Sequence, residues 1–361
     1  MIILGIETSC DETALCLLET HENEGDFEYK VLKNIIHSQI DLHKEYGGVY
    51  PSLAKREHIK NLPILFEKIK KDTGIDEEKI DIIAVTKGPG LEPALWTGIT
   101  FGSELSKKYN IPLMLINHME GHIVSTMVDT SEAHSDFRKI KKINTPALAL
   151  LISGGHTELV KINSLGSYEI LGSTKDDAVG EAFDKVARML GLPYPGGPEI
   201  GKLAKIAREE LKENTEVKNP IILPRPMINS KDLNFSFSGL KTAVLYTIKK
   251  LGDLSYENKK EISREFEDAV TDVLISKTKK ALENDGYKTL IIGGGVIANE
   301  HIRNAFKNIA SEFDIPLYLP AKGLTGDNAL MIALVAMFFA SRNEKKNSQD
   351  IKADGNLSLG N

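Results

Sequence analysis

Apolar and polar residues follow one another along the chain in two patterns. Residues 2–19 (IILGIETSCDETALCLLE) contain two apolar strands joined by a short turn rich in Thr, Ser and Asp. Segments with apolar residues every three or four positions follow, which indicates amphipathic helices. Apolar runs at 81–90 and 288–299 are typical of parallel strands buried on both faces. This order predicts an α/β protein with mostly parallel or mixed sheets.

Residues 146–162 (PALALLISGGHTELVKI) repeat the plan of the first segment: apolar strand, small polar turn, second strand. A repeat at half the chain length indicates two duplicated lobes. The length of 361 residues agrees, since single hydrophobic cores stop growing at about 250–300 residues.

The predicted boundaries follow from this repeat and from the changes in pattern beside it. We expect a first lobe over 1–145, completed by an apolar helix at 328–341, and a second lobe over 146–327. Residues 172–245 break the repeat and predict a helical insertion in the second lobe. The polar stretch 342–361 predicts a disordered tail.

Composition narrows the class of protein. No apolar run approaches the roughly 20 residues that a membrane span needs, so we expect no membrane association and a cytoplasmic location. The net charge of −6 argues against binding nucleic acid over the whole surface. Local clusters such as Arg138-Lys139 and Lys249-Lys250 are candidates for a basic face that binds nucleic acid, although most runs of charged residues are only solvated surface.

Three turns together suggest a nucleotide site between the two lobes: the Thr-, Ser- and Asp-rich turn within residues 2–19 and two turns that contain glycines. Ser153, Gly154 and Gly155 lie in the turn of the second repeat, where backbone N–H groups and hydroxyls can approach phosphate oxygens. The run GGGVIAN ends in Asn299, which is suited to hydrogen-bond a sugar or a base. A separate turn that leads into a helix, KGPGLEPALWTGIT at 87–100, fits an anion-binding helix start and a tight strand-to-helix connection equally well.

Two histidines and an aspartate are candidates for a metal site. His118 and His122 in NHMEGH are spaced to lie on one face of a helix, near enough to share a cation. Glu120 stands two positions after the first histidine, unlike the glutamate of HExxH peptidases, so it cannot act as their general base. Asp327 in GLTGDNA completes a set of two histidines and one carboxylate, which leaves positions open for a substrate.

Asp184 lies among apolar residues in the predicted helix DDAVGEAFDKVAR. Its position suits either the binding of ligand hydroxyls or a salt bridge with Arg188.

The motifs, in their order, resemble the TsaD family of tRNA threonylcarbamoyladenosine transferases, once labelled sialoglycoprotein endopeptidases, and its bacterial and organellar branch in particular. The resemblance runs from residue 5 to about residue 333 and rests on GIETSCDETA, YPSLAKREH, GPGLEPALWTGI, NHMEGHI, LLISGGHTEL, DDAVGEAFDKVARMLGLPYPGGP, FSFSGLKTAV, GGGVIAN and GDNALMIA. The chain departs from the family where GLTGDNA replaces the commoner CTDNA.

The resemblance implies the actin-like ATPase fold (ASKHA), two duplicated lobes with a nucleotide cleft between them. It also implies that His118, His122 and Asp327 bind one divalent metal ion, Fe²⁺ or Zn²⁺. By motif position, the residues that would contact the adenine nucleotide are Leu151, Ile152, Ser153, Gly154, Gly155, Asp184, Gly197 and Asn299.

The family transfers a threonylcarbamoyl group from threonylcarbamoyl-AMP to the N6 amine of the adenosine at position 37, beside the anticodon, in tRNAs that read ANN codons. Asp11 in the first turn is a candidate proton acceptor, or equally a capping residue. The resemblance also implies tRNA as a partner, with a TsaB-like paralogue and a TsaE-like ATPase, and a homodimer is possible. Three alternatives stay open at this point: a small-molecule kinase of the same fold, a metallopeptidase and a regulatory ATP-binding scaffold.

Overall fold

A computed structural model of the chain describes residues 1–23, 26–129, 136–213, 220–342 and 351–360. The chain divides into two units. The first unit comprises Met1–Ile143 and Pro320–Asn361, and the second comprises Asn144–Leu319. Among the described residues, no helix combines the length and the apolar character needed to cross a bilayer.

The sheet of the first unit has six strands in the order β5-β4-β1-β2-β3-β6. β1 lies in the middle, antiparallel to β2 and parallel to β4. β4 is parallel to β5, whereas β3 is antiparallel to β2 and β6. The strands are β1 (Ile2–Glu7), β2 (Glu12–Asn23), β3 (Asp26–Ser38), β4 (Ile82–Gly88), β5 (Leu113–Asn117) and β6 (Arg138–Lys139).

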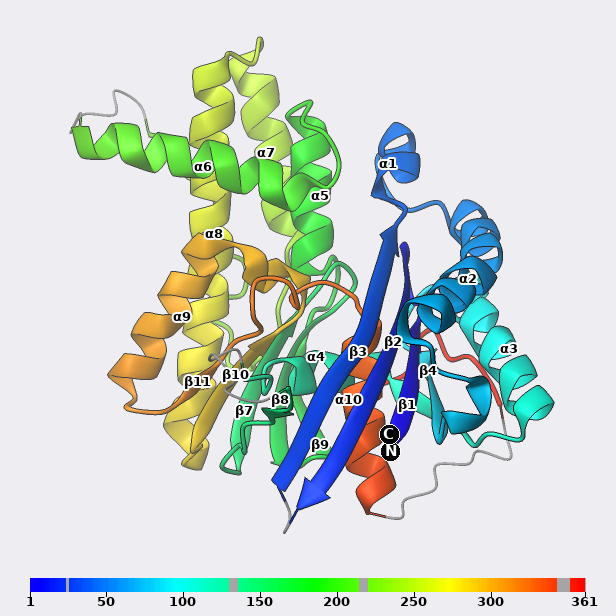
Figure 1. The fold of residues 1–361 in the computed structure, drawn as a ribbon. Helices are drawn as coiled ribbons and strands as arrows, with labels where there is room; N and C mark the ends of the chain where they lie inside the picture. Colours follow the sequence, from blue (N-terminus) through cyan, green and yellow to red (C-terminus); the bar gives the residue numbers. More distant parts are fainter. Residues whose placement is uncertain (24–25, 130–135, 214–219, 343–350, 361) are drawn as a thin grey trace. The chain divides into compact units, whose positions relative to one another are not determined.

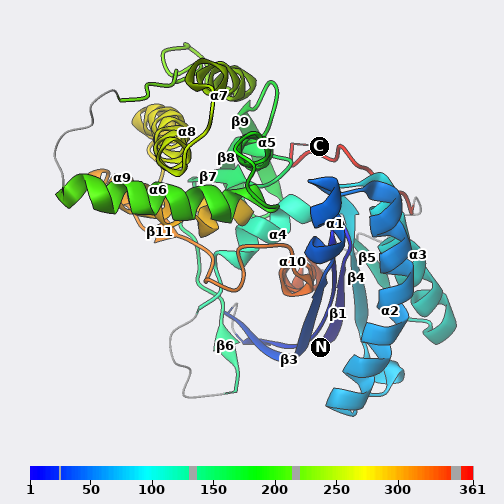
Figure 2. The ribbon, with the colours of Figure 1, turned by 90° about the horizontal axis from the view of Figure 1, so that it is seen from above.

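Helices cover both faces of this sheet. α2 (Pro51–Thr73) and α3 (Glu92–Tyr109) pack on one face through leucine and isoleucine side chains, and α10 (Ala329–Ser341) lies on the other (Figures 1 and 2). α10 is apolar along almost its whole length and buried from Ala329 to Phe339, which explains why the chain returns to the first unit. The remaining helical segments of the unit are α1 (Ile40–His43), η1 (Lys44–Tyr46), η2 (Glu77–Lys79) and α4 (His118–Ser125).

The sheet of the second unit repeats the central five-stranded plan, in the order β11-β10-β7-β8-β9. β7 is antiparallel to β8 and parallel to β10, as β1 is to β2 and β4. The strands are β7 (Ala147–Ile152), β8 (Thr157–Ser164), β9 (Ser167–Ser173), β10 (Thr289–Gly293) and β11 (Leu317–Tyr318). The predicted repeat is therefore confirmed at the level of sheet topology.

The second unit carries a group of helices between β9 and β10. They are α5 (Val179–Met189), α6 (Gly196–Glu213), α7 (Ser238–Leu251) and α8 (Tyr256–Asp285), and η3 (Gly295–Ala298) and α9 (Glu300–Glu312) follow β10. Figure 1 shows α6 crossing α8 at a steep angle. These helices continue beyond the predicted insertion of 172–245 to Asp285, and α8 supplies buried apolar side chains such as Phe266 and Leu274 to the core of this unit.

The end of the chain differs from its prediction. Residues 342–361 read as a disordered tail, yet Ala353 and Leu359 are buried within the first unit. The N–H group of Asp354 donates to the carbonyl of Lys87, and that of Gly90 donates to the carbonyl of Gly355. Small residues allow this close packing despite the polar composition. Residues 343–350 and 361 lie outside the described part of the chain.

Candidate metal centre and nucleotide pocket

Three side chains of the first unit converge: His118, His122 and Asp327. The two histidines lie one helical turn apart on α4, and Asp327 stands just before α10. Nε2 of His118 and Nε2 of His122 lie 3.3 and 3.4 Å from Oδ1 of Asp327. One ligand atom from each residue lies within 4.8 Å of the other two, and no other set of His, Cys, Asp or Glu among the described residues has this arrangement.

The approach of α4 to α10 has a local cause in the sequence. Asn117 ends β5 and caps α4, since its side chain accepts a hydrogen bond from the N–H group of Met119. A Cβ at Gly121 would lie 2.8 Å from Cγ of Met331, so glycine allows the two helices to touch. A Cβ at Gly5 would lie 2.4 Å from the carbonyl oxygen of Ala329, so β1 also meets the start of α10 closely. These contacts bring Asp327 beside the histidines.

The cluster belongs to one unit. The sequence places Asp327 at the end of the second lobe, but Pro320–Asn361 groups with the first unit because α10 packs on the first sheet. The glycine that precedes Asp327 in GLTGDNA does not turn the carboxylate away from the histidines. Glu120 is 4% exposed and is not part of the cluster.

The residues fit a divalent cation. His122 is fully buried, and neither of its ring nitrogens has a hydrogen-bond partner in the described part of the chain. Nε2 of His122 lies 3.4 Å from Oδ1 of Asp327, farther than in an ordinary hydrogen bond, and a cation between the two atoms would satisfy both of them. Two imidazoles and one carboxylate suit zinc or iron and leave coordination positions open.

The charged side chains of this cluster shift one another's pKa values. Burial lowers the pKa of His118, but the carboxylates of Asp327 and Glu7 outweigh burial and hold that pKa well above its ordinary value. Burial raises the pKa of Asp327, but the neighbouring His118 and His122 hold it well below its usual range. The carboxylate therefore stays ionised and available as a ligand.

Asp11 lies in the turn between β1 and β2 and is 6% exposed. Its Oδ2 atom is buried without a hydrogen-bond partner in the described residues, so this oxygen caps nothing there. Nε2 of His58 lies 2.9 Å from the carbonyl oxygen of Cys10 and ties the turn to α2. Burial and the negative charge of Asp11 raise the pKa of the neighbouring Glu12 to about 10.

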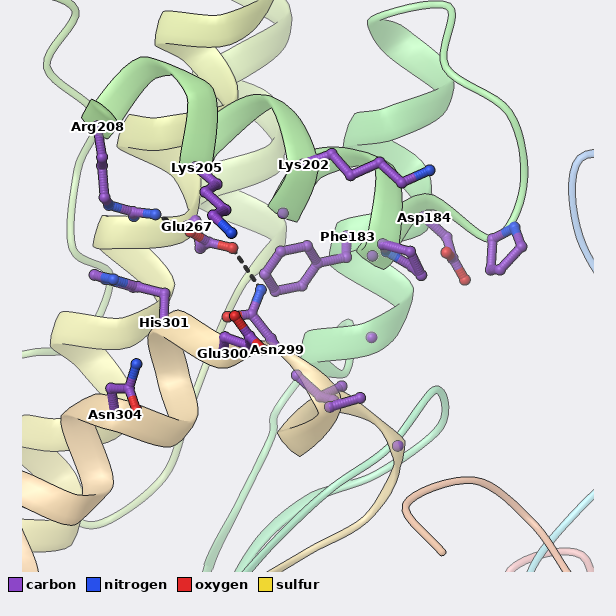
Figure 3. Close-up of a pocket in the computed structure, with 18 of the residues that line it drawn as sticks. Phe183, Asp184, Lys202, Lys205, Arg208, Glu267, Asn299, Glu300, His301 and Asn304 are labelled. Atoms are coloured by element: carbon purple, nitrogen blue, oxygen red, sulfur yellow. Dashed lines mark hydrogen bonds and ion pairs between the residues drawn. The ribbon is translucent and has the colours of Figure 1, made fainter. Parts of the chain in front are cut away.

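The second unit contains a pocket of about 660 Å³, within the usual range for ligand sites. Figure 3 shows the pocket between α6, α8 and the start of α9. The ring of Phe183 and several glycines supply its apolar and open walls, and charged side chains lie at its edge. It is lined by Gly154, Gly180, Phe183, Asp184, Pro195, Gly197, Pro198, Gly201, Lys202, Lys205, Arg208, Glu209, Lys212, Glu267, Gly295, Val296, Ala298, Asn299, Glu300, His301 and Asn304.

Half of the predicted nucleotide residues line this pocket, namely Gly154, Asp184, Gly197 and Asn299. A Cβ at Gly154 or Gly197 would meet nothing within 4 Å, so both backbones are open to a ligand. Oδ1 of Asp184 accepts a hydrogen bond from the N–H group of Gly196 at 2.7 Å. This bond fixes the PGG turn against α5.

The other four predicted residues, Leu151, Ile152, Ser153 and Gly155, are not among the lining residues. Leu151 and Ile152 are fully buried in β7. Ser153 closes its own turn, since its N–H group donates to the carbonyl of His156 and its hydroxyl accepts from the N–H group of His156. These residues therefore shape the wall that Gly154 presents.

Asn299 has two structural contacts. Its Oδ1 accepts from the N–H group of Ile302 and caps α9, and its Nδ2 donates to Oε1 of Glu267 at 2.5 Å (Figure 3). In the glycine run before Asn299, position 294 needs a glycine. Gly294 has φ +96°, and a Cβ there would lie 2.3 Å from the carbonyl oxygen of Ile152. Only Gly295 of that run lines the pocket.

Sequence reasoning missed the charged side of the pocket. Glu267 is 1% exposed in α8 and pairs with Arg208 of α6, while Lys205 extends beside Glu267 (Figure 3). The spacing of Lys202, Lys205 and Arg208, three residues apart after the PGG turn, was a usable signal for a basic helix face. Glu267 gives no such local signal, since only tertiary packing brings α8 to α6.

Sequence comparison decides the family. The pattern of the TsaD family, described as tRNA N6-adenosine threonylcarbamoyltransferase, matches residues 30–334. The curated relative of that name from Thermosipho melanesiensis is 45% identical over 334 residues, which cover 92% of this chain and 93% of the relative. The one from Nitrosomonas europaea is 44% identical, with 92% and 91% covered. The chain belongs to the TsaD family of tRNA N6-adenosine threonylcarbamoyltransferases.

Solved structures of other proteins share the fold of this TsaD chain. HypF from T. kodakarensis has a TM-score of 0.56 at 13% identity, over 96% of this chain and 48% of HypF. The activator of 2-hydroxyisocaproyl-CoA dehydratase from Clostridium difficile has a TM-score of 0.50 at 14% identity, over 96% and 98%. These likenesses confirm the predicted actin-like fold. The family assignment decides against the kinase, peptidase and scaffold alternatives.

Proposed function

We propose that this enzyme transfers the threonylcarbamoyl group of threonylcarbamoyl-AMP to the N6 amine of the adenosine beside the anticodon, in tRNAs that read ANN codons. The observation that carries the proposal is the convergence of His118, His122 and Asp327 in a chain of the TsaD family. The pocket of the second unit supports it, because its volume and wall chemistry suit an adenine nucleotide.

The proposal assigns the adenylate to the second-unit pocket. Phe183 and Val296 offer apolar surface to a base, and the carboxylates of Asp184 and Glu300 are acceptors for ribose hydroxyls. Lys205 offers a positive charge for a phosphate. Leu151, Ile152, Ser153 and Gly155 act by holding Gly154, while Gly197 and Asn299 contact the nucleotide.

His118, His122 and Asp327 hold the divalent cation, Zn²⁺ or Fe²⁺, in this proposal. When bound, the cation acts as a Lewis acid on a carbonyl or phosphate oxygen of the substrate. The protein fixes the position of the cation before the substrate arrives, since α4, which carries both histidines, and the start of α10, which follows Asp327, are buried.

The reaction forms one bond and breaks one. The N6 nitrogen attacks the carbamoyl carbon, the bond between that carbon and the phosphate oxygen breaks, and AMP leaves with the electron pair. The N6 amine loses one proton, which we assign to the unpaired Oδ2 of Asp11. An adenine amine is a weak nucleophile, so positioning supplies much of the acceleration.

The proposal includes partners. The net charge of −6 indicates that tRNA binding needs basic surface from another subunit, which we assign to a TsaB-like paralogue, with a TsaE-like ATPase completing the set in the cytoplasm. A homodimer of this chain remains part of the hypothesis.

The proposal is tested by incubating the chain and its bacterial partners with threonylcarbamoyl-AMP and unmodified tRNA, then measuring threonylcarbamoyladenosine by nucleoside mass spectrometry. We expect product with wild type, and roughly 10²–10⁴-fold less with Asp11→Asn, the usual loss for a general base. A parallel reaction with ATP in place of the adenylate should give none. Failure of wild type in the presence of folded partners would overturn the proposal, and equal product from Asp11→Asn would remove Asp11 from it.

A further inference from the structure

Glu7 is a carboxylate in the interior of the first unit, at the last position of β1. It is 0% exposed, and the reaction proposed above gives it no role. Burying an ionised carboxylate is costly unless it is paired and hydrogen-bonded. Its contacts therefore indicate what it does.

The contacts of Glu7 include one metal-binding histidine. Oε2 of Glu7 lies 2.9 Å from Nδ1 of His118 and accepts the hydroxyl of Thr86 at 2.6 Å. Oε1 accepts the N–H group of Ser9 at 2.5 Å. Both oxygens are thus used, and one of them faces the ring nitrogen of His118 that does not face Asp327.

The position of Glu7 is set by the rigid centre of the sheet. β1 pairs with β2 on one side, where Glu7 is opposite Ala14, and with β4 on the other, where the last registered pair is Ile6 with Val85. Thr86 is the next residue of β4, so its hydroxyl reaches Glu7 from the adjacent strand. Because strand pairing on both sides sets the backbone of β1 at this point, Glu7 is a fixed reference point for a ring on α4 even without the Thr86 hydroxyl.

We propose that Glu7 is a positioning residue that fixes the tautomer and orientation of His118 for metal binding. With Nδ1–H donated to Glu7, the ring offers Nε2 to the cation, on the side where Oδ1 of Asp327 lies 3.3 Å away, and Nε2 gives up its proton when the cation binds. A carboxylate behind a ligand histidine restricts the ring and increases the basicity of the ligating nitrogen. The inference rests on the metal assignment made above.

The two histidines differ in this respect. Nδ1 of His118 has Glu7 at 2.9 Å and the hydroxyl of Ser9 at 3.3 Å, whereas Nδ1 of His122 has no hydrogen-bond partner among the described residues. His122 contacts the ring of His118 and lies 3.4 Å from Oδ1 of Asp327, but no hydrogen bond from a described residue fixes the far side of its ring, so the orientation of the metal site depends mainly on His118. Loss of Glu7 should therefore affect the whole site.

The competing explanation is that Glu7 only stabilises the end of β1. Thr86→Val provides the matched control, because it removes a hydrogen bond to the same oxygen of Glu7 while the contact with His118 stays. It weakens the packing of the same buried carboxylate without touching the ligand ring.

The experiment measures Zn²⁺ affinity of the full chain by competition with a coloured chelator, with folding checked by circular dichroism and thermal unfolding. The variants are Glu7→Gln, Glu7→Ala, Thr86→Val and His122→Ala, and the visible absorption of bound Co²⁺ reports the ligand geometry. Glu7→Gln keeps the size of the side chain, so it remains informative if Glu7→Ala does not fold.

We expect Glu7→Ala and Glu7→Gln to weaken Zn²⁺ binding about 10–100-fold, with the smaller loss for Gln, and to alter the Co²⁺ spectrum. Thr86→Val should lower the unfolding temperature but change the affinity less than about threefold. Wild-type affinity in folded Glu7→Gln, or an equal loss in Thr86→Val, would overturn the inference while the metal site stands. If His122→Ala binds Zn²⁺ as wild type does, both the metal assignment and this inference fail.

Discussion

Oδ1 of Asp327 lies 3.4 Å from Nε2 of His122, on a histidine that is fully buried and lacks a hydrogen bond from either ring nitrogen in the described part of the chain. Stable interiors rarely leave such groups without partners. The relationship is therefore better explained by a ligand shared between the two residues than by their contribution to folding.

Asp327→Asn should remove most of the metal affinity. The substitution keeps the size of the side chain but replaces a charged ligand with a neutral one. We expect Zn²⁺ binding to weaken by at least about 100-fold, since even loss of a hydrogen-bonding partner behind a ligand costs 10–100-fold. Chelator competition measures the change. Asp354→Asn, which alters a carboxylate that accepts from Asn356 in the same unit, should bind as wild type does.

Glu12→Gln should stabilise the protein at alkaline pH. Burial and Asp11 raise the pKa of Glu12 to about 10 in the folded state, so folded Glu12 keeps a proton that the unfolded chain releases. The folded pKa exceeds the unfolded value, so this group contributes less stability as pH rises from about 4.5 towards 10. Glutamine has no proton to lose.

The expected result is a gain in the free energy of unfolding of at least about 1 kcal/mol at pH 8 for Glu12→Gln. Urea unfolding of chelator-treated protein measures it at several pH values. The difference from wild type should shrink towards pH 5, and a difference that does not depend on pH would contradict the raised pKa.

Lys205→Ala should weaken nucleotide binding more than Lys202→Ala. Both lysines line the pocket, but Nζ of Lys202 already lies 2.6 Å from Oε1 of Glu199. Lys205 extends beside Glu267 and forms no ion pair with another described residue, so its charge is available for a phosphate (Figure 3). We expect AMP affinity to fall about tenfold for Lys205→Ala, since a hydrogen bond to a charged group contributes about 1.5 kcal/mol at the low end. Titration calorimetry at two salt concentrations measures this, and an equal loss in both variants would argue against a phosphate at Lys205.

Leu359→Ala should destabilise the protein even though it lies at the end of the chain. Leu359 is 6% exposed, and the carbonyl of the adjacent Ser358 accepts from Nδ2 of Asn117, the cap of α4. We expect a loss of about 2 kcal/mol in the free energy of unfolding, at the low end for buried leucines. Ile351→Ala, at a position 42% exposed, is the control and should cost much less. Urea unfolding that finds equal effects would show that the segment does not pack.

The hydrophobic pattern was sufficient to predict the two-lobed fold. Residues 2–19 and 146–162 show the same alternation, and each forms an antiparallel pair beside a parallel strand. The alternation of apolar and polar residues in a strand involves only residues close together in the chain, so the sequence alone predicts it. The prediction for the end of the chain was wrong because it relied on local composition, which is polar there. The burial of Ala353 and Leu359 depends instead on contacts with residues far away in the sequence.

The sequence by itself determined the strands, the duplication and the identity of the metal-binding candidates, because these depend on local spacing and on residue chemistry. The tertiary structure alone decided that Asp327 belongs to the first unit, that Glu7 lies behind His118, and that Glu267 pairs with Arg208 in the pocket. Each of these is a contact between residues far apart in the chain. Such contacts follow from how helices pack on a sheet, which no local pattern records.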